Sequence, residues 1–168
     1  MRSRSLLAVA CMVLLACTWQ VAARSGEDEK SPMDTLRSLE GTWVSEEPGN
    51  DGQPYTLVFK VTAAKSVVTE VMFPGSNHEM LNTYHKNGDD LIVTHYCAQG
   101  VQPRMKMVSN ENGVMRFEFL DCTNLKEGEG CMGGLELSVA DGKLTEKWFY
   151  LTDGKLSGPT VFTLVRKG

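Results

Sequence analysis

The sequence has few cysteines, few prolines and a shortage of basic residues, and each shortage excludes a class of protein. Five cysteines and six prolines in 168 residues are too few for a disulfide-rich scaffold, collagen or a proline-rich disordered chain. The 17 lysines and arginines are outnumbered by 21 aspartates and glutamates. Because nucleic-acid-binding domains carry a clustered excess of basic residues, no nucleic-acid partner is expected. The length corresponds to a single domain.

The only long hydrophobic run lies at the N-terminus and is typical of a secretory signal peptide. Arg2 and Arg4 precede the apolar run 6–16, and Ala23 ends a stretch of small residues that a signal peptidase can cleave. The run of about 11 residues is shorter than the roughly 20 that a membrane-spanning helix needs. We therefore expect a signal peptide at residues 1–23, a polar leader at 24–32 and a folded domain at 33–168.

A second interpretation of the same segment is a lipoprotein signal. Leu14-Leu15-Ala16-Cys17 resembles a bacterial lipobox, in which residues 1–16 are removed and Cys17 is lipidated. In both interpretations the protein is exported, and it is expected to be secreted or periplasmic. Contact with a membrane is expected only if Cys17 carries a lipid.

Three cysteines remain after removal of the signal peptide, an odd number for an oxidising compartment. Cys122 and Cys131 flank a glycine-rich loop, and this spacing fits a disulfide that closes the loop. Cys97 would then be a free thiol. Three reduced thiols in a protected core are the alternative.

Most of the remaining sequence is predicted to be β-strand. About ten runs with strand-like periodicity are separated by turns rich in Gly, Asn and Asp. Such turns are too short for helical crossovers, so neighbouring strands should pair antiparallel, and closure into a barrel removes exposed edges. We predict an all-β fold, a single up-and-down antiparallel barrel, preceded by a short helix from Met33 to Glu40. The strands are expected at 42–46, 55–62, 66–73, 79–86, 91–97, 104–108, 114–121, 135–140, 144–151 and 160–167.

Two hairpins predict which side chains face the barrel interior. Around the turn at 87–88, even positions before the turn share a face with odd positions after it. A two-residue turn at 141–142 places Glu146 and Trp148 on the same apolar face as Leu137. Polar groups on apolar faces need partners, which a ligand can supply. The predicted ligand-binding residues are His78, Asn82, Tyr84, His95, Cys97, Glu146 and Trp148.

The same reasoning predicts a pair on the outer face of the hairpin at 141–142 and the register of the hairpin at 109–113. The same two-residue turn sets Glu136 opposite Lys147, a cross-strand ion pair on the solvent side. A loop over 109–113 would set Met107 opposite Met115. Phe119 would then share the inner face with these two methionines.

The first and last predicted strands contain a further pattern. Gly41-Thr42-Trp43 follows the helix at the start of the first strand, and Arg166 lies near the end of the last. This pattern resembles the calycin superfamily, the barrels of lipocalins and fatty-acid-binding proteins. The resemblance implies a structural role for Gly41, Trp43 and Arg166, with the arginine packed across the tryptophan ring at the closed end. The Thr-Asp-Tyr motif that follows a middle strand in lipocalins is missing.

The chain also resembles exported bacterial proteins with a lipocalin-like domain. This second likeness covers most of the folded domain and implies no chemistry. It is carried by residues 78–80, 84–85, 94–97 and 102–105.

His95 is the leading candidate for a ligand contact. It is expected opposite Met80 or Asn82, and a neutral imidazole can donate from one nitrogen and accept at the other. His78, His95 and Cys97 on one face also suit a transition metal or haem iron. The sequence lacks the paired spacing of a structural metal site, such as Cys-x-x-Cys, so we assign no metal ligands and expect no cofactor.

Glu146 on an apolar face raises the alternative of an enzyme, with Glu146 and His95 as acid and base in one cavity. No nucleophile elbow, catalytic-triad spacing or second paired carboxylate is recognisable, so no catalytic residue is assigned. The favoured function is an exported, non-enzymatic carrier of a small apolar or amphipathic molecule held inside the barrel. A solidly packed structural or interaction barrel without a ligand is the other alternative.

Overall fold

The structure is a computed structural model that describes residues 30–49 and 52–168. The expected signal peptide 1–23, the candidate lipidation site Cys17 and residues 24–29 of the expected leader lie outside the described residues. No helix in the described part of the chain is long and apolar enough to cross a membrane.

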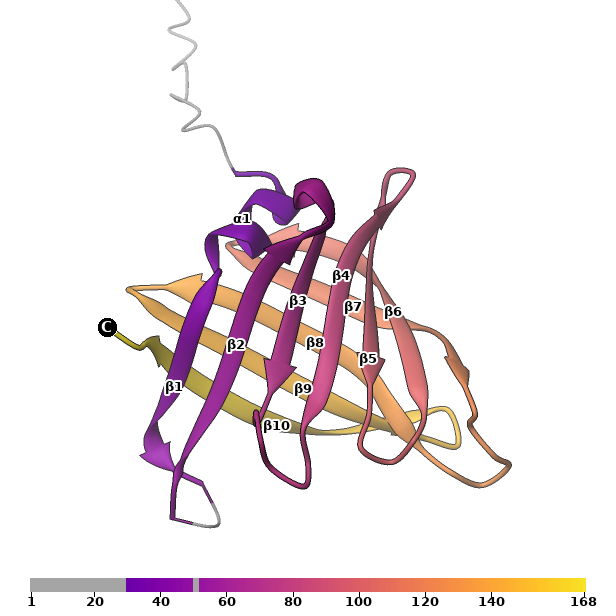
Figure 1. The fold of residues 1–168 in the computed structure, drawn as a ribbon. Coiled ribbons are helices and arrows are strands. Elements are labelled where there is room, and N and C mark those ends of the chain that lie inside the picture. Colours follow the sequence, from indigo (N-terminus) through magenta and orange to yellow (C-terminus); the bar gives the residue numbers. More distant parts are fainter. Residues whose placement is uncertain (1–29, 50–51) are drawn as a thin grey trace, which may run out of the picture.

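The described residues form one closed antiparallel barrel with a short helix before it, as the sequence predicted (Figure 1). Each strand pairs with its neighbours in the chain, and β1 pairs with β10 to close the barrel. The elements are α1 Pro32–Ser38, β1 Gly41–Pro48, β2 Pro54–Thr62, the 3₁₀ turn η1 Ala63–Lys65, β3 Val67–Met72, β4 Met80–Asn87, β5 Asp90–Tyr96, β6 Gln102–Glu111, β7 Val114–Thr123, β8 Cys131–Ala140, β9 Lys143–Thr152 and β10 Lys155–Arg166.

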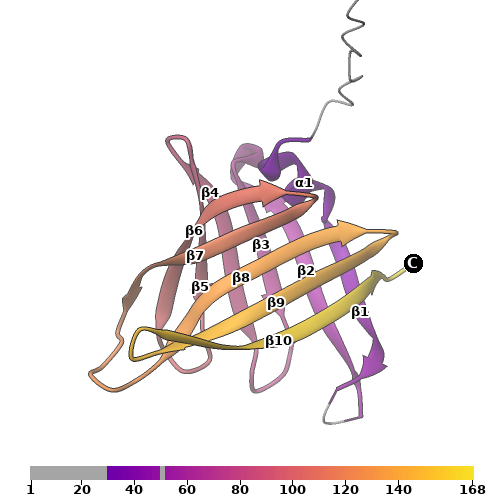
Figure 2. The ribbon, with the colours of Figure 1, turned by 180° about the vertical axis from the view of Figure 1, so that it is seen from behind.

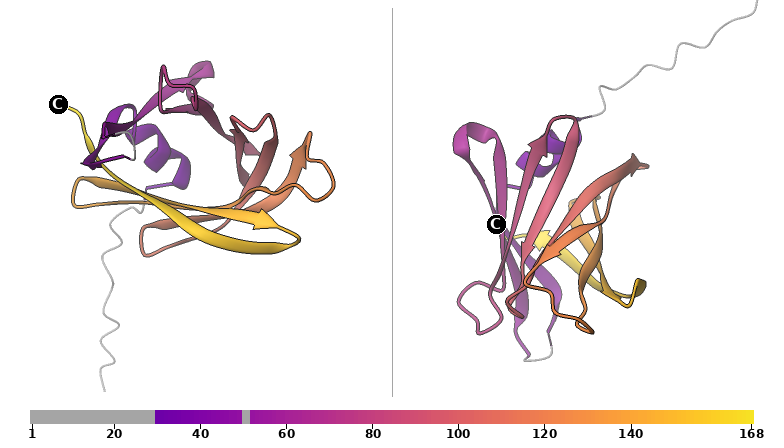
Figure 3. Two further views of the ribbon diagram at one scale, coloured as in Figure 1. Left: turned by 90° about the horizontal axis from the view of Figure 1, so that it is seen from below. Right: turned by 90° about the vertical axis from the view of Figure 1, so that its right-hand side faces the viewer.

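The barrel has two walls and two different ends. Strands β1 to β5 make up the wall that faces the viewer in Figure 1, and β7 to β10 make up much of the wall in front in Figure 2. Helix α1 lies at the end where β1 begins, which we call the closed end. The view from the opposite end, the open end, looks between the two walls toward α1 (Figure 3, left).

The helix closes its end because its sequence caps and buries it. The Ser31 hydroxyl accepts a hydrogen bond from the Asp34 amide, which satisfies one of the free N–H groups of the first turn. Pro32 occupies the first turn, where its missing N–H costs nothing. Met33 and Leu36 are buried beneath the helix, so its apolar side plugs the barrel.

Arg166 connects the last strand to the closed end. Its guanidinium carbon lies 4.6 Å from the centre of the Trp43 ring, and Nη2 donates to the Ser38 carbonyl over 2.7 Å. The Trp43 indole N–H donates in turn to the Leu39 carbonyl over 2.8 Å. Gly41 has φ 127°, and a Cβ at this position would stand 2.8 Å from Arg166 Nη1. Only glycine fits both the backbone and the arginine there.

Turn chemistry explains most of the register. Asp141 (φ 51°) and Gly142 (φ 76°) both have left-handed backbone, as a two-residue hairpin turn requires. The pairs Leu137–Glu146 and Leu135–Trp148 follow as predicted. On the outside, Lys147 Nζ lies 3.5 Å from Glu136 Oε2, which confirms the predicted ion pair.

The predicted register of β6 and β7 was wrong. Met107 pairs with Phe117 and Met115 with Asn110, because β6 continues to Glu111 and the pairing shifts at two irregular positions. The predicted loop over 109–113 is therefore mostly strand. Phe119 is 38% exposed instead of lying inside, because the shift interrupts the alternation of faces.

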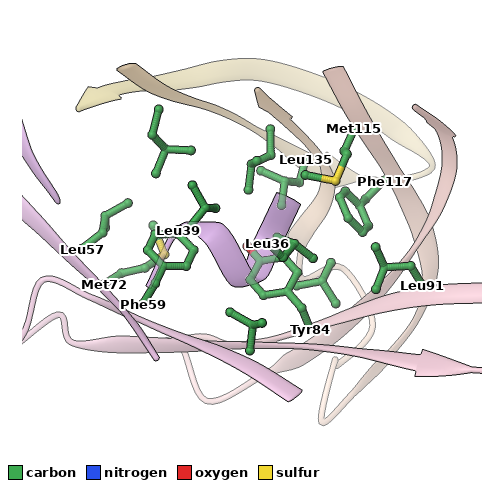
Figure 4. Close-up of a cluster of buried hydrophobic side chains, with 14 of the residues drawn as sticks. Leu36, Leu39, Leu57, Phe59, Met72, Tyr84, Leu91, Met115, Phe117 and Leu135 are labelled. Atoms are coloured by element: carbon green, nitrogen blue, oxygen red, sulfur yellow. The ribbon is translucent and has the colours of Figure 1, made fainter. Parts of the chain in front are cut away.

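The core fills the space between the walls, next to the helix. Figure 4 shows side chains from both walls pointing toward one another around α1. Leucine, methionine and aromatic side chains predominate, and Leu36, Leu57, Tyr84 and Leu135 are fully buried. A ring pair, Tyr84 and Phe117, connects β4 to β7 with centroids 6.2 Å apart.

Candidate functional site

A row of three polar side chains crosses the inner face of β3, β4 and β5. The strand register places Glu70 beside Asn82 and Asn82 beside His95. The Asn82 amide nitrogen donates to Glu70 Oε2 over 2.8 Å, and Asn82 Oδ1 lies 2.7 Å from His95 Nδ1. All three side chains are essentially inaccessible to solvent. Alternation of faces in three adjacent strands has therefore assembled a buried hydrogen-bonded chain.

The hydrogen bonds that join Glu70, Asn82 and His95 determine the tautomer of His95. Because the Asn82 amide nitrogen is used on Glu70, its carbonyl oxygen faces the imidazole, and Nδ1 must carry the proton to donate to it. Burial lowers the pKa of His95 to about 4, so the ring is neutral at pH 7. Nε2 then carries a lone pair, is buried and has no hydrogen-bond partner.

The opposite wall contributes Glu146 and Trp148 from β9. The Trp148 indole N–H donates to Glu146 Oε2 over 2.9 Å, and its ring lies 5.1 Å from the imidazole of His95. The carboxyl groups of Glu70 and Glu146 lie near enough to each other that the charge of Glu70 affects the ionisation of Glu146. The polar row and the β9 pair thus form one buried polar layer between the walls.

The two buried carboxyl groups cannot both be ionised at low cost. Desolvation raises the pKa of Glu70 to about 7, and desolvation with the charge of Glu70 raises the pKa of Glu146 well above its usual range. Of the two carboxyl groups, Glu146 therefore holds its proton more strongly. Glu70 Oε1 and Glu146 Oε1 are both buried and have no hydrogen-bond partner.

Tyr84 adds a donor on the closed-end side of the layer. Its hydroxyl donates to Glu70 Oε2 over 2.7 Å, and burial next to two carboxyl groups raises the pKa of Tyr84 well above its usual range. One Glu70 oxygen thus receives bonds from both Tyr84 and Asn82. These bonds favour ionisation of Glu70 over ionisation of Glu146.

The structure brings together five of the seven predicted ligand-binding residues and separates two. Asn82, Tyr84, His95, Glu146 and Trp148 meet in the polar layer.

His78 does not join the layer, because β4 begins only at Met80 and His78 lies exposed in the preceding loop. Cys97 follows the end of β5 and is partly buried near the open end, where its thiol lies 3.8 Å from Gln99 Oε1.

Glu70 was missed by the sequence analysis, which found no second carboxyl group to pair with Glu146. In the structure Glu70 alternates with Val68 and Met72, and all three side chains are buried. An acidic residue in a six-residue strand gives no sign of which face it occupies until the neighbouring strand is in register.

A pocket of about 420 Å³ opens beside the ends of β5 and β9, at the open end of the barrel. We call it the mouth pocket. Its lining combines Val101 with polar groups of Gln99, Tyr150 and Thr152. Tyr150 follows Trp148 by two residues on β9, a rise of about 7 Å along a strand. The mouth pocket therefore lies about one residue pair beyond the polar layer.

Methionines lie on the open-end side of the polar layer, at about the level of Tyr150. Met72 and Met80 pair across β3 and β4, two residues nearer the open end than Glu70 and Asn82. Met132, which pairs with Tyr150, also packs against the core. Unbranched methionine side chains reorient easily, so this level can make room for a chain entering from the mouth.

The three cysteines gather near the open end and are free thiols in this structure. The Cys122 thiol donates to the Thr123 carbonyl over 3.5 Å, and burial raises the pKa of Cys131 to about 12. A disulfide between them remains a prediction. In residues 30–49 and 52–168, no three His, Cys, Asp or Glu side chains are grouped to hold a metal ion.

The comparisons with known proteins assign this barrel to no family: no family model matches the chain, and no curated protein matches it. The functional argument therefore depends on the geometry of the site.

Proposed function

We propose that the protein is an exported carrier that binds a small, mostly apolar molecule inside the barrel. The observation that carries the proposal is His95 Nε2, a buried acceptor with no partner, on a ring whose tautomer is fixed by Asn82 and Glu70. A buried acceptor without a partner costs free energy, which a ligand donor group would recover. The ligand is therefore an apolar body with at least one hydrogen-bond donor.

The surroundings of the site support an apolar ligand body. Met72, Trp148 and Leu57 are buried close to the polar layer, and the mouth pocket lies on the open-end side of it. The ligand body would occupy the mouth pocket and the methionine level, with its donor directed to His95. Few polar groups in an apolar surround are typical of small-molecule sites.

The resemblance to calycins agrees with this proposal. A helix-closed barrel with Arg166 over Trp43 is the architecture that the resemblance implies. We infer that the chain is a calycin-type barrel and that ligands enter at the end away from α1. Export, by cleavage after Ala23 or by lipidation at Cys17, would place the carrier in the periplasm or outside the cell.

The test is ligand retention by the exported protein. We expect native mass spectrometry of protein purified from its own source to show a bound small molecule, and the purified protein to take up a fluorescent apolar probe. His95→Ala should weaken binding by roughly tenfold or more, because Nε2 is lost. The matched control is His85→Ala, a half-buried histidine on the outer face of β4, which should leave binding unchanged.

Two results would contradict the carrier proposal. An empty protein that takes up no probe would favour a packed structural barrel. A His95→Ala protein that melts several degrees lower but keeps its affinity would make His95 an ordinary core residue.

A second candidate function, acid–base catalysis, follows from one observation. A neutral imidazole with a free Nε2 and a protonated Glu146 occupy the same layer, the states needed for a general base and a general acid. Turnover of esters, lactones or lipid peroxides that stops in both His95→Ala and Glu146→Gln would favour this enzyme. Simple binding without turnover would favour the carrier.

A further inference from the structure

The polar layer contains acidic groups but no basic group to balance them. Of the described residues, the buried polar side chains are Ser45, Glu70, Asn82, His95 and Glu146, with no lysine or arginine among them. A buried carboxylate is strongly destabilising unless a cation or several donors compensate it. Glu70 receives two neutral donors on Oε2, and its other oxygen, Oε1, has no hydrogen-bond partner.

The three atoms left without a partner share one chemistry. Glu70 Oε1, Glu146 Oε1 and His95 Nε2 are all buried, and all three can accept a hydrogen bond. The free lone pair of the imidazole is fixed at Nε2 by the bond from Nδ1 to Asn82, whose amide is in turn oriented by Glu70. A ligand that satisfies this layer must bring donors, and a positive charge on it would compensate the negative charge of the two carboxyl groups.

We propose that the ligand class is a primary amine with an apolar body, bound as the ammonium ion between Glu70, Glu146 and His95. This inference rests on the proposed carrier function and specifies its ligand. An ammonium group has three N–H donors and one positive charge, and it meets three acceptors in the layer. The Trp148 ring beside His95 adds a face that attracts cations.

The same layer discriminates against fatty acids. A bound carboxylate would lie beside two acidic groups and would find no buried lysine or arginine among the described residues. A neutral alcohol can donate one hydrogen bond to His95 Nε2, but it cannot compensate the charge of the carboxyl pair. The expected order of affinity is amine, then alcohol, then carboxylate.

The experiment compares octylamine, octan-1-ol and octanoate, which share one chain and are cationic, neutral and anionic at pH 7. Calorimetric titration of the mature protein should give at least tenfold tighter binding of octylamine than of octan-1-ol, and no detectable binding of octanoate. Octylamine binding should also release up to one proton per ligand from the carboxyl pair, measured from the heats in two buffers of different ionisation enthalpy. This proton release needs only the wild-type protein.

Variants assign the preference to the carboxyl pair. In Glu70→Gln with Glu146→Gln, the ratio of amine to alcohol affinity should fall to near one, whereas Glu118→Gln on the exposed face of β7 should keep the wild-type ratio. Equal or tighter binding of octan-1-ol or octanoate by the wild type would overturn the amine inference and leave the carrier proposal standing. Failure to bind any of the three or the fluorescent probe would refute the carrier proposal itself, and the amine inference with it.

Discussion

At the scale of single residues, Glu70 and His95 respond to pH in opposite directions. Burial raises the pKa of Glu70 to about 7, so the folded state holds a proton there that the unfolded chain releases above about pH 4.5. Burial lowers the pKa of His95 to about 4. Below about pH 6.5 the unfolded chain therefore binds a proton at His95 that the folded state does not bind. Between these limits the two effects partly cancel in the wild type.

The variant Glu70→Gln separates the effect of Glu70 on the pH dependence of stability from the effect of His95. The stability of the wild type relative to the variant should fall as pH rises from about 4.5 to about 7, because in that interval the folded state keeps a proton on Glu70 that the unfolded chain has released. The slope should reach at most about 1.4 kcal/mol per pH unit, the limit for one proton. Urea unfolding of both proteins at pH 5, 6 and 7 measures the difference.

The control for this prediction is Glu118→Gln, which removes an exposed carboxyl group from the outer face of β7. Its stability should follow the wild-type curve at every pH. A wild-type advantage over Glu70→Gln that stays constant or grows with pH would show that Glu70 is ionised in the folded protein across this interval.

The residues of the site differ in how far the sequence could predict them. Asn82, Tyr84 and His95 follow from strict alternation next to a clear turn, and Glu146 and Trp148 follow from the two-residue turn at 141–142. Glu70 becomes part of the site only through contacts with other strands, which one strand's pattern does not contain. His78 was misplaced because alternation has no meaning beyond the first residue of β4.

At the scale of elements, hairpins with two left-handed turn residues were predictable, and irregular pairings were not. The turn at 141–142 needs Asp and Gly, so the sequence identifies it, and the register of β8 and β9 follows. The shifts between β6 and β7 come from extra residues in the ladder, which carry no specific residue signal. Strand positions were therefore predicted better than the partners across β6 and β7.

The contact between β10 and the closed end gives a second prediction. Arg166→Ala removes the ring contact with Trp43 and two hydrogen bonds to carbonyls at the end of α1, to Ser38 and Glu40. Because Arg166 is exposed, we expect a loss of about 1–2 kcal/mol in the free energy of unfolding. Urea denaturation measures it.

Arg166→Lys keeps the charge without the forked donor geometry and should lose an intermediate amount. Lys167→Ala, at the next and exposed position, is the matched control and should be nearly neutral. If Arg166→Ala unfolded like Lys167→Ala, the arginine contact would contribute nothing measurable to closing the barrel.

At the scale of the whole molecule, the prediction concerns the exported form. We expect intact-mass analysis of the protein from its own source to give a chain that begins at Arg24, and thiol labelling under denaturing, non-reducing conditions to modify Cys97 alone. The reason is the small-residue cleavage site, together with the oxidising compartment in which Cys122 and Cys131 would pair. A lipid-modified chain beginning at Cys17 would identify a lipoprotein, and three labelled thiols would refute the disulfide.

The pairing of β1 with β10 has a consequence for how the barrel assembles. Every other strand pair joins neighbours in the chain, whereas this pair joins residues such as Trp43 and Arg166 across almost the whole folded domain. Closing so long a loop has the greatest entropy cost of any strand pairing in the barrel. Only three aligned residue pairs between β1 and β10 offset this cost. We therefore expect the β1–β10 seam to be the last contact to form during folding and the first to part in a local opening. Arg166 and the bond from the Lys167 amide to the Thr42 carbonyl join the two sides of this seam, and the ion pair of Glu46 on β1 with Lys143 on β9 reaches across β10 to reinforce it.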